Sequence, residues 1–542
     1  MRFGSAFLCL LFGWATLSII SVWARPLLPI DETRYAQVAW EMHLSGDWLV
    51  PRIHGEPYSH KPPLLFWLIN LGWSVLGEHP WVARLVGALI TLADLLLLGA
   101  LARRLWPGDA RAAALAPWVF YASLLVLALS TTLMFDLLMT CAVLIGVLGL
   151  LDTVQRDRGW LLFALATALG LLAKGPALLL YLLPVTLASP WWLARAPAAG
   201  WARWHGYLLL SLAVGIALAL CWAIPAVARG GEAYRDMLLW GQTAGRMANA
   251  FAHERPWWWY LPLLPLLLLP WALWPHLWRA LHRLLRQAAA AERLCLVWLL
   301  AGVLGFSAIS GKQVHYLLPL MPAWALLVAR ALSQLPAPRP GLASCMLVLA
   351  PWLLAGSALA IGPLLGSAVK VPGWLRELSP WAGAALVAAT LAWLVPLRRR
   401  PGALSLAALP LMFLILLHGL VIKAIAPHFA LLPLTDHLEA AQRQGKAIAL
   451  AAQFRDQYPF SRPMPQVMTL LREGEEIAWA RANPQGLLVI NHKRISAEQL
   501  QAAQRYQPIR SGYSVIWSAQ TLLDTPGLLD SELPLNALNI AD

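Results

Sequence analysis

An acidic pair follows the first long apolar segment of the chain. Asp31 and Glu32 come directly after Pro29-Ile30, and Arg34 and Tyr35 follow within one helical turn. Carboxylates in such a place can act as a base, stabilise charge or bind a metal ion. They can also serve a helix, because Asp31 would cap a helix that begins at Glu32 and acids favour a helix N-terminus. Taken alone, the pair favours the cap.

Other ionisable or polar residues are predicted on the same side of the membrane as this pair. They are Lys61, Asp136, Arg246, His253, Lys312, His315 and Tyr316. Ionisable groups at membrane depth are costly and usually functional. Several cations beside two or three carboxylates suit a phosphate-bearing substrate, whose oxygens Lys and Arg bind.

Each of these residues also has a structural interpretation. Lys312 and Arg246 could anchor a span at its interface, and Asp136 could cap a helix. Lys174 could simply mark a tight outer turn, since Gly175 and Pro176 follow it.

His60 and His253 form the candidate metal site. Neutral imidazoles bind zinc, and both residues are predicted outside, so we consider a divalent metal, zinc or magnesium, at this pair. Two histidines from distant loops support it weakly. The five cysteines all lie in apolar segments, where no zinc-type pair or disulfide is expected.

The elements that position these residues must be membrane helices. The chain is 59% hydrophobic and 13% charged, and its mean hydropathy is +0.62. Soluble domains carry about 25% charged residues. We therefore predict an all-α polytopic membrane protein with about thirteen transmembrane helices. The predicted spans are near 5–24, 82–102, 112–132, 134–151, 160–173, 176–193, 205–228, 257–278, 294–310, 314–332, 342–362, 380–397 and 402–423.

The arginine clusters give the orientation. They occur in every second loop, and therefore on one side of the membrane, as at Arg103 and Arg104, at Arg283 and Arg286, and at 398–400. The positive-inside rule places that side in the cytoplasm. The loops 25–81 and 229–256 then face the periplasm of a bacterial inner membrane. The net charge of +14 arises from these clusters, so we expect no nucleic-acid partner.

Two segments of the first outer loop have helical patterns. PIDETRYAQVAWEM and HKPPLLFWLINLGWSVLG should lie as helices along the membrane surface. The apolar run before them could alternatively be a cleaved signal peptide ending near Ala24, although it is long enough to span. In either case the residues after it face outward.

A small soluble domain is predicted at 426–542, after the transmembrane domain 1–425. Acids and bases are nearly balanced there. The stretches 446–454, 486–494 and 512–519 look like strands, and those near 435–444, 465–473 and 496–504 look helical. We predict a periplasmic α/β domain that serves as a lid, an acceptor platform or a structural cap.

Four passages resemble a known family, the bacterial GT-C glycosyltransferases related to lipid A aminoarabinose transferase and to the dolichyl-phosphate-mannose protein mannosyltransferases. They are PIDETRYAQVAWEMHLSGDWLVPRIHGEPYSHKPPLLFW, MFDLLM, GRMANAFAHERPWWWYLP and SGKQVHYLLPLMPAWALL. The resemblance runs from the first span to about residue 330. The chain departs from the aminoarabinose enzymes at His60, where they usually have Glu.

The resemblance implies roles for individual residues. Asp31, Glu32 and Asp136 match the catalytic acids, and Lys61 matches the lysine that binds the donor phosphate. Arg246 and Tyr316 match its helpers, Tyr35 and Tyr58 match positions of the sugar pocket, and His253 matches the loop histidine.

The resemblance predicts an inverting glycosyltransferase. Its donor would be a polyprenyl-phosphate sugar, such as undecaprenyl-phosphate aminoarabinose, and its acceptor lipid A or another envelope glycan or protein. The first alternative is a transporter or flippase of a lipid-linked sugar, which would use broken helices and midplane charges. The second is a non-catalytic sensor or scaffold whose soluble tail binds a partner.

Overall fold

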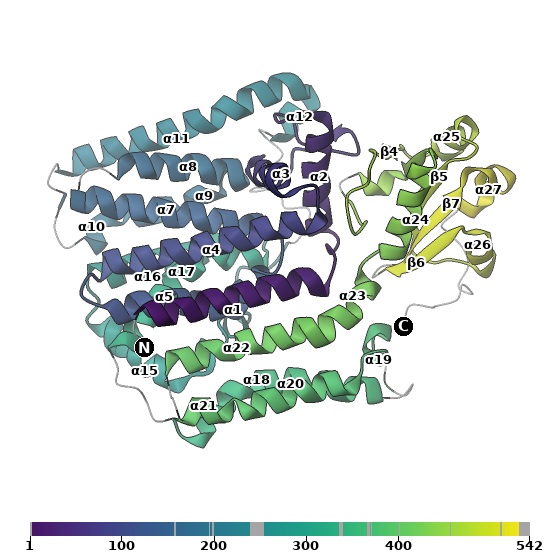
Figure 1. Ribbon diagram of the computed structural model, residues 1–542. Helices are drawn as coiled ribbons and strands as arrows, with labels where there is room; N and C mark the ends of the chain where they lie inside the picture. The colour runs from purple at the N-terminus through teal and green to yellow at the C-terminus, as the bar shows by residue number, and fades with distance from the viewer. Residues whose placement is uncertain are drawn as a thin grey trace.

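The computed structural model describes most of the chain as a helical bundle with a small sheet at one end (Figure 1). The described residues are 3–156, 159–193, 196–197, 200–238, 254–334, 340–365, 369, 371–399, 402–455, 457–509 and 512–529. This architecture confirms the predicted fold class, an all-α membrane protein with a small C-terminal α/β unit.

Most of the bundle is formed by thirteen of the described helices. They are α1 (Phe3–Ala24), α4 (Pro80–Leu105), α5 (Ala110–Ala122), α6 (Leu124–Leu129), α7 (Phe135–Arg156), α8 (Trp160–Lys174), α9 (Leu178–Leu187), α11 (Gly200–Gly230), α16 (Ala290–Ala308), α17 (Met321–Ser333), α18 (Leu342–Ile361), α20 (Pro380–Ala392) and α22 (Ala403–Leu417). Shorter elements complete it: α10 (Ser189–Trp192), α12 (Glu232–Asp236), α14 (Leu264–Leu267), α15 (Pro275–Arg286), α19 (Gly373–Arg376), α21 (Leu394–Arg399), α23 (Lys423–Phe429), η1 (Gly175–Ala177), η3 (Trp271–Leu273), η4 (Val314–Leu320), η5 (Gly362–Leu364) and η6 (His418–Ile422).

Ten helices in the described part are long and apolar enough to cross a membrane. The predicted thirteen spans include shorter pieces. One of them is 112–132, where the extended backbone of Ser123 separates α5 from α6. The number thirteen therefore stays a prediction.

The sequence explains how the first span ends and the next helix begins. Helix α1 has 22 residues without a charge, so it is about 33 Å long, enough for the bilayer core. Pro26 cannot continue it. Helix α2 (Asp31–Ser45) begins at Asp31 and ends at Ser45, and the following Gly46 adopts the left-handed conformation with φ 65°. Asp31 and Glu32 occupy its first turn, where the helix dipole favours acids.

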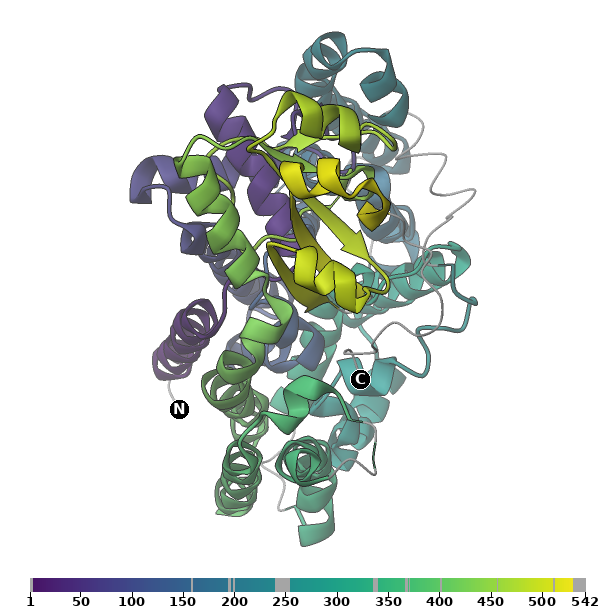
Figure 2. The same ribbon diagram turned by 90° about the vertical axis from the view of Figure 1, so that its right-hand side faces the viewer.

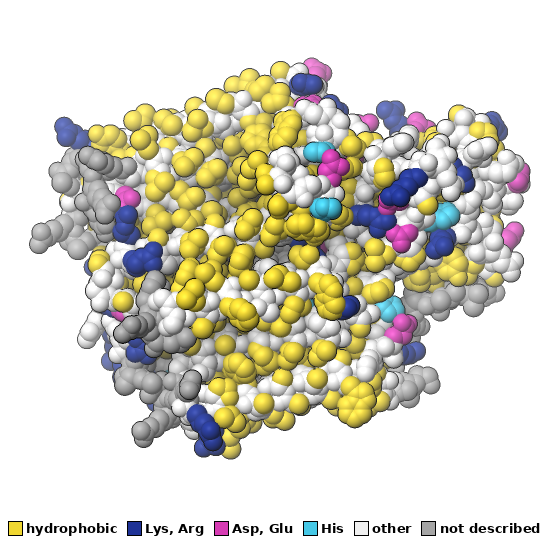
Figure 3. All heavy atoms as spheres, viewed as in Figure 1, with side chains coloured by type: hydrophobic (Ala, Val, Ile, Leu, Met, Phe, Trp, Pro, Cys, Tyr) yellow, Lys and Arg dark blue, Asp and Glu magenta, His cyan; other side chains and the backbone are white. Residues whose placement is uncertain are grey.

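The ends of the bundle differ in charge. Hydrophobic side chains cover its middle, while Lys and Arg gather toward the ends (Figure 3). Arg103 and Arg104 close α4, and α15 carries Arg283 and Arg286; both lie at the end away from α2 (Figure 1). This distribution agrees with the predicted orientation.

The first outer loop contains the two predicted helices, α2 and α3 (Leu64–Leu76). Between them lies a short antiparallel hairpin of β1 (Arg52–Ile53) and β2 (Glu56–Pro57), which the sequence pattern did not indicate. The hairpin turns at Gly55, with φ 77°. It therefore brings the segment 57–63 back toward the start of α2.

The C-terminal unit is a five-stranded sheet of order β4-β3-β5-β7-β6 with helices around it. Its elements are α24 (Leu432–Arg443), β3 (Ile448–Leu450), η7 (Ala452–Phe454), β4 (Thr469–Leu470), α25 (Glu476–Ala482), β5 (Leu487–His492), α26 (Ala497–Ala502), β6 (Arg505–Ile509), β7 (Gly512–Ser518), α27 (Ala519–Asp524) and η8 (Pro526–Leu529). Side chains are buried on both faces of β5. Leu487 and Val489 join the core that includes α24, whereas Leu488 and Ile490 join the opposite one.

The predicted elements of this unit are largely confirmed. The three strands appear as β3, β5 and β7, and two of the helices appear as α24 and α26. The predicted helix at 465–473 is wrong, because the segment is extended and contains β4, which pairs in parallel with β3. Pro463 and Pro465 precede β4, and the residue before a proline is disfavoured in a helix.

Candidate active site

Asp31 is the exposed member of the acidic pair. Its side chain is 46% exposed, and Oδ1 accepts hydrogen bonds from Arg34 Nη2 and, at 3.3 Å, from the Tyr35 hydroxyl. Because helix α2 begins at Asp31, with no side-chain cap at its N-terminus, the interpretation of Asp31 as an N-cap is wrong. Its carboxylate remains accessible to a substrate.

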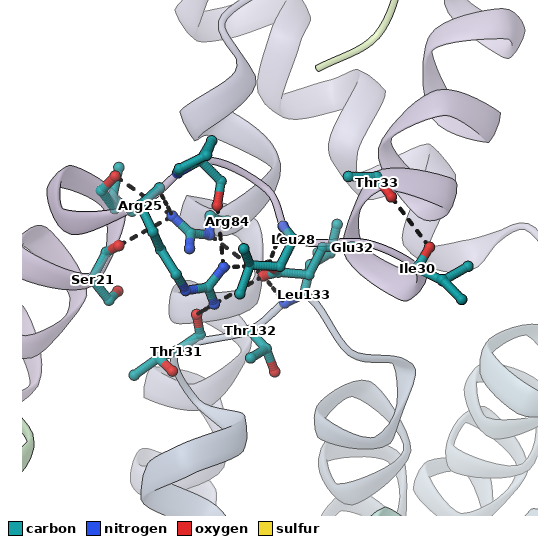
Figure 4. A network of polar contacts seen from close by, with 12 residues as sticks. Ser21, Arg25, Leu28, Ile30, Glu32, Thr33, Arg84, Thr131, Thr132 and Leu133 are labelled. Atoms are coloured by element: carbon teal, nitrogen blue, oxygen red, sulfur yellow. Dashed lines mark hydrogen bonds and ion pairs between the residues drawn. The ribbon is translucent and has the colours of Figure 1, made fainter. Parts of the chain in front are cut away.

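Glu32 is the buried member of the pair. Its carboxylate forms ion pairs with Arg25 and, at 3.4 Å, with Arg84 Nε, and the Glu32 side chain is 6% exposed (Figure 4). It also accepts hydrogen bonds from two backbone N–H groups, those of Leu28 and Leu133, each at 3.0 Å. Glu32 therefore joins the α1–α2 linker, α4 and the start of α7.

The charges around Glu32 keep its carboxyl ionised. Burial alone would raise the pKa of Glu32, but Arg25 and Arg84 with their hydrogen bonds lower it below its usual value. Arg25 and Arg84 also donate to backbone carbonyls. Arg25 Nη2 lies 2.9 Å from Thr131 O, and Arg84 Nη1 lies 2.8 Å from Arg25 O.

An aromatic wall lies beside Asp31. The rings of Tyr35 and Phe135 meet edge to face at 4.8 Å, and Phe66 contacts Phe135 at 5.5 Å. Tyr58 contacts Phe66 at 6.2 Å, so both predicted sugar-pocket tyrosines belong to this wall. Burial and the nearby Asp31 and Tyr58 raise the pKa of Tyr35 well above its usual value, so its hydroxyl remains a donor.

Lys61 lies at the same wall. Its ammonium is 5.8 Å from the centre of the Phe135 ring, and it interacts electrostatically with Asp136. The hairpin β1–β2 and the segment that follows thus bring Lys61 to the start of α7. The structure brings this predicted phosphate ligand close to Asp136, one of the predicted acids.

Asp136 pairs with a residue that sequence reasoning had set aside. Its carboxylate Oδ1 accepts a hydrogen bond from Lys174 Nζ at 2.5 Å, and its side chain is 2% exposed. His315 Nε2 lies 3.9 Å from the other oxygen. The Lys174 ammonium also lies 4.5 Å from the centre of the Tyr316 ring. Helices α7 and α8 and η4 therefore meet at one buried ion pair.

Lys312 occupies a different position. It is 3% exposed, and its ammonium donates to the backbone carbonyls of Arg255, at 3.0 Å, and Ile309. A bridge between Glu254 and Gly311 joins the same two segments. Lys312 thus ties together two segments of the chain, and its phosphate-binding role stays a prediction.

The remaining predicted ligands are not brought together in the described residues. His60 contacts the Tyr58 ring at 5.2 Å, whereas Arg246 and His253 lie outside the described residues. Within the described ranges, no three His, Cys, Asp or Glu side chains gather in a way that could hold a metal ion. The divalent metal stays a prediction.

The sequence analysis did not single out two cations of this region, Arg25 and Arg84, and it interpreted a third, Lys174, as the marker of a turn. Each lies in or beside an apolar segment, where an ionisable residue is costly. That context was the available signal, but two of the three cations have partners that are distant in sequence, whereas Arg25 lies 7 residues from Glu32. Arg84 lies 52 residues from Glu32, and Lys174 lies 38 residues from Asp136.

Comparison with known proteins identifies relatives of this chain. A family model described as dolichyl-phosphate-mannose-protein mannosyltransferase matches residues 60–224. An undecaprenyl phosphate-alpha-4-amino-4-deoxy-L-arabinose arabinosyl transferase of Edwardsiella ictaluri is 30% identical over 456 residues, which cover 73% of this chain and 80% of that protein.

A protein with the same description from Pseudomonas aeruginosa is 36% identical over 313 residues. That alignment covers 56% of this chain and 55% of the relative, so the chain spans about half the length of that relative. The crystal structure of ArnT from Cupriavidus metallidurans bound to undecaprenyl phosphate has a TM-score of 0.73 at 20% identity, covering 96% of this chain and 98% of that chain. The predicted GT-C fold is thereby confirmed.

Proposed function

The chain belongs to the family of undecaprenyl phosphate-alpha-4-amino-4-deoxy-L-arabinose arabinosyl transferases, and from this premise we propose that it is a polyprenyl-phosphate-sugar-dependent glycosyltransferase. The donor is undecaprenyl-phosphate aminoarabinose or a close analogue. The acceptor is lipid A or another envelope molecule at the periplasmic face of the bacterial inner membrane. The family relationship supports both partners.

One observation carries this proposal, namely the gathering of opposite charges from distant segments beside an aromatic wall. Asp31, Lys61 and Asp136 all interact electrostatically with His315, and Lys174 pairs with Asp136. A phosphodiester carries one negative charge, and ammonium groups beside a hydrophobic wall bind its oxygens while the sugar contacts the rings.

In the proposed reaction, the sugar is transferred from the polyprenyl phosphate to the acceptor in one displacement step. The acceptor oxygen attacks the anomeric carbon, and the bond from that carbon to the phosphate oxygen breaks. Polyprenyl phosphate leaves with the electron pair of that bond, and the configuration at the anomeric carbon is inverted. Lys61, helped by Arg246 and Tyr316, stabilises the growing charge on the phosphate.

Asp31 acts on the acceptor. It is the accessible carboxylate, and the Tyr35 hydroxyl and Arg34 fix its orientation. If the acceptor is a hydroxyl group, Asp31 takes its proton. If the acceptor is a phosphate of lipid A, that group is already ionised near neutral pH, and Asp31 mainly positions it.

Glu32 has a different task in this proposal. Its carboxylate is occupied by two guanidinium groups and two backbone N–H groups. We assign it a positioning role: it fixes the first turn of α2 against α4 and the start of α7, and so places Asp31.

Reconstitution of the purified chain in vesicles tests the function. With undecaprenyl-phosphate aminoarabinose carrying a labelled sugar and with lipid A, we expect labelled lipid A, which mass spectrometry identifies. A matched donor with a neutral sugar measures selectivity. Movement of the labelled donor across the bilayer with no sugar transfer would support a flippase instead and contradict the proposal.

A further inference from the structure

The segment 457–464 of the C-terminal unit, called here the docking segment, lies against the outer loop that carries the candidate site. Figure 2 shows the C-terminal sheet and its helices in front of α2, and Figure 1 shows them beside α2 at the same end of the bundle. The contacts between the two include hydrogen bonds to three backbone carbonyls of the docking segment.

Two of these hydrogen bonds come from α2 itself. The fully buried Thr33 hydroxyl lies much closer to the carbonyl oxygen of Tyr458, to which it donates, than to that of Ile30, which is 3.3 Å away (Figure 4). Farther along the helix, Trp40 Nε1 donates to the carbonyl oxygen of Met464 at 2.7 Å. The docking segment thus contacts α2 two residues after Asp31 and again two turns later.

A third contact comes from the hairpin that precedes Lys61. His54 Nε2 lies 2.9 Å from the carbonyl oxygen of Gln457, which can only accept, so Nε2 carries the proton. The His54 ring also stacks on Tyr458 at 5.9 Å. Glu41 of α2 accepts from the backbone N–H groups of His54, at 2.7 Å, and Gly55, at 2.9 Å.

His54 has an uncommon backbone conformation for a residue other than glycine, with φ 55°. Such a conformation persists when the surrounding contacts determine it. At His54 these contacts come from Glu41 on one side and from the docking segment on the other.

The docking segment is itself fixed to the rest of the C-terminal unit. The buried Tyr458 donates its hydroxyl to Arg462 O at 3.0 Å. The Arg462 guanidinium pairs with Asp436 and Glu439 of α24, with Nη2 2.7 Å from Asp436 and Nε 2.7 Å from Glu439. A displacement of this unit would therefore reach α2 and the hairpin together.

We propose that the C-terminal unit acts as a positioning element for transfer. Its docking segment contacts both the first turn of α2, which carries Asp31, and the hairpin β1–β2. It thereby holds Asp31 at a fixed distance from Lys61, which lies on the segment after the hairpin. Thr33 is the positioning residue on α2. This inference rests on the proposed transferase function, and it selects the structural cap among the three roles that the sequence left open for this unit.

The test uses single substitutions in the full chain. Thr33→Val keeps the side-chain shape and removes the donor, whereas Thr33→Ser keeps the hydroxyl. Because a misplacement of about 1 Å can cost ~100-fold in rate, we expect Thr33→Val to lower kcat by roughly 10-fold. The KM for the donor should be little changed, and Thr33→Ser should restore kcat.

A second variant and a control separate positioning from loss of fold. Trp40→Phe removes the hydrogen bond to Met464 and should lower kcat in the same way. Gln507→Ala removes a contact of the C-terminal unit with Ala430, 3.0 Å long, which does not involve α2, and it should leave kcat unchanged. The amount of donor bound per protein should equal that of the wild type in all variants.

The outcomes distinguish the two proposals. If the wild-type chain transfers sugar and Thr33→Val keeps its kcat, or if kcat and donor binding fall in parallel, the positioning role is wrong. If the wild type transfers no sugar, the proposed function fails. Hydrogen exchange then tests whether the docking segment holds α2 in place. If it does, Thr33→Val should speed the exchange of backbone amides at 33–40 of α2. Unchanged exchange there would overturn the inference.

Discussion

Asp31 and Glu32 are neighbours with opposite surroundings. The Asp31 side chain is 46% exposed, whereas that of Glu32 is 6% exposed and lies between two arginines. In the sequence they look like one acidic pair. The partners of Glu32 are Arg25 and Arg84, which lie near opposite ends of the outer loop, and the sequence does not show that they meet. Only the folded chain separates a carboxylate that can meet a substrate from one that cannot.

Glu32→Gln should lower the free energy of unfolding by about 3–5 kcal/mol, because it leaves two buried guanidinium groups without their charge partner. Thermal unfolding in detergent measures this. The control is Glu78→Gln, since Glu78 is 56% exposed and pairs with His43. Exposed pairs contribute little, so equal destabilisation by both variants would contradict the structural role of Glu32.

Acidification should destabilise the folded chain through the carboxylate of Glu32. The pKa of folded Glu32 lies below its usual value of 4.5, so its contribution to stability is present above about pH 4.5 and is lost as pH falls through the folded pKa. The wild-type chain should therefore lose more stability on acidification than Glu32→Gln. Parallel acid profiles of the two proteins would count against this explanation.

The ion pair of Lys174 and Asp136 makes a second prediction at this scale. Lys174→Met should destabilise the chain, because the Asp136 side chain, 2% exposed, keeps its charge but loses the ammonium that is hydrogen-bonded to it. Asp136→Asn combined with Lys174→Met should be less harmful than the sum of the single changes, with a coupling energy of roughly 1–3 kcal/mol. A double-mutant cycle by thermal unfolding measures it, and additive effects would refute the pairing.

At the scale of elements, local sequence patterns predicted the helices and strands whose formation depends mainly on neighbouring residues. The apolar runs and proline positions gave α1, α3 and the strands β5 and β7. The hairpin β1–β2 was missed because two-residue strands carry no periodic pattern. The segment 465–473 was assigned to a helix, but it pairs with β3, a contact that no local pattern reveals.

Gly46 connects the helix that carries Asp31 to the hairpin, and its replacement is a test at this scale. Gly46→Ala should cost about 1 kcal/mol of stability, because φ 65° strains any side chain even though no atom lies within 4 Å of the new Cβ. Gly206→Ala, inside α11 and equally open, is the matched control and should not destabilise the chain, because alanine favours a helix interior by up to about 1 kcal/mol over glycine. Similar losses for both variants would contradict this explanation.

At the scale of the whole molecule, composition alone predicted the membrane-spanning bundle and the alternating arginines predicted its orientation. The docking of the C-terminal unit on α2 was beyond such reasoning. Thr33 and Tyr458 are 425 residues apart, and hydrogen bonds to backbone carbonyls leave no mark on the sequence. Charge and the predicted side of the membrane were enough to single out Asp31, Lys61 and Asp136, whereas their individual roles came from the family resemblance.

The central claim is that Asp31 acts in sugar transfer from a polyprenyl phosphate, and Asp31→Asn in the reconstituted chain tests it most directly. Asp524→Asn, at an exposed carboxylate on α27, is the control and should transfer at the wild-type rate. We predict that Asp31→Asn binds the labelled donor normally and loses ~100-fold in kcat, whether Asp31 acts as the base or positions the acceptor. Undiminished transfer by Asp31→Asn would contradict the account.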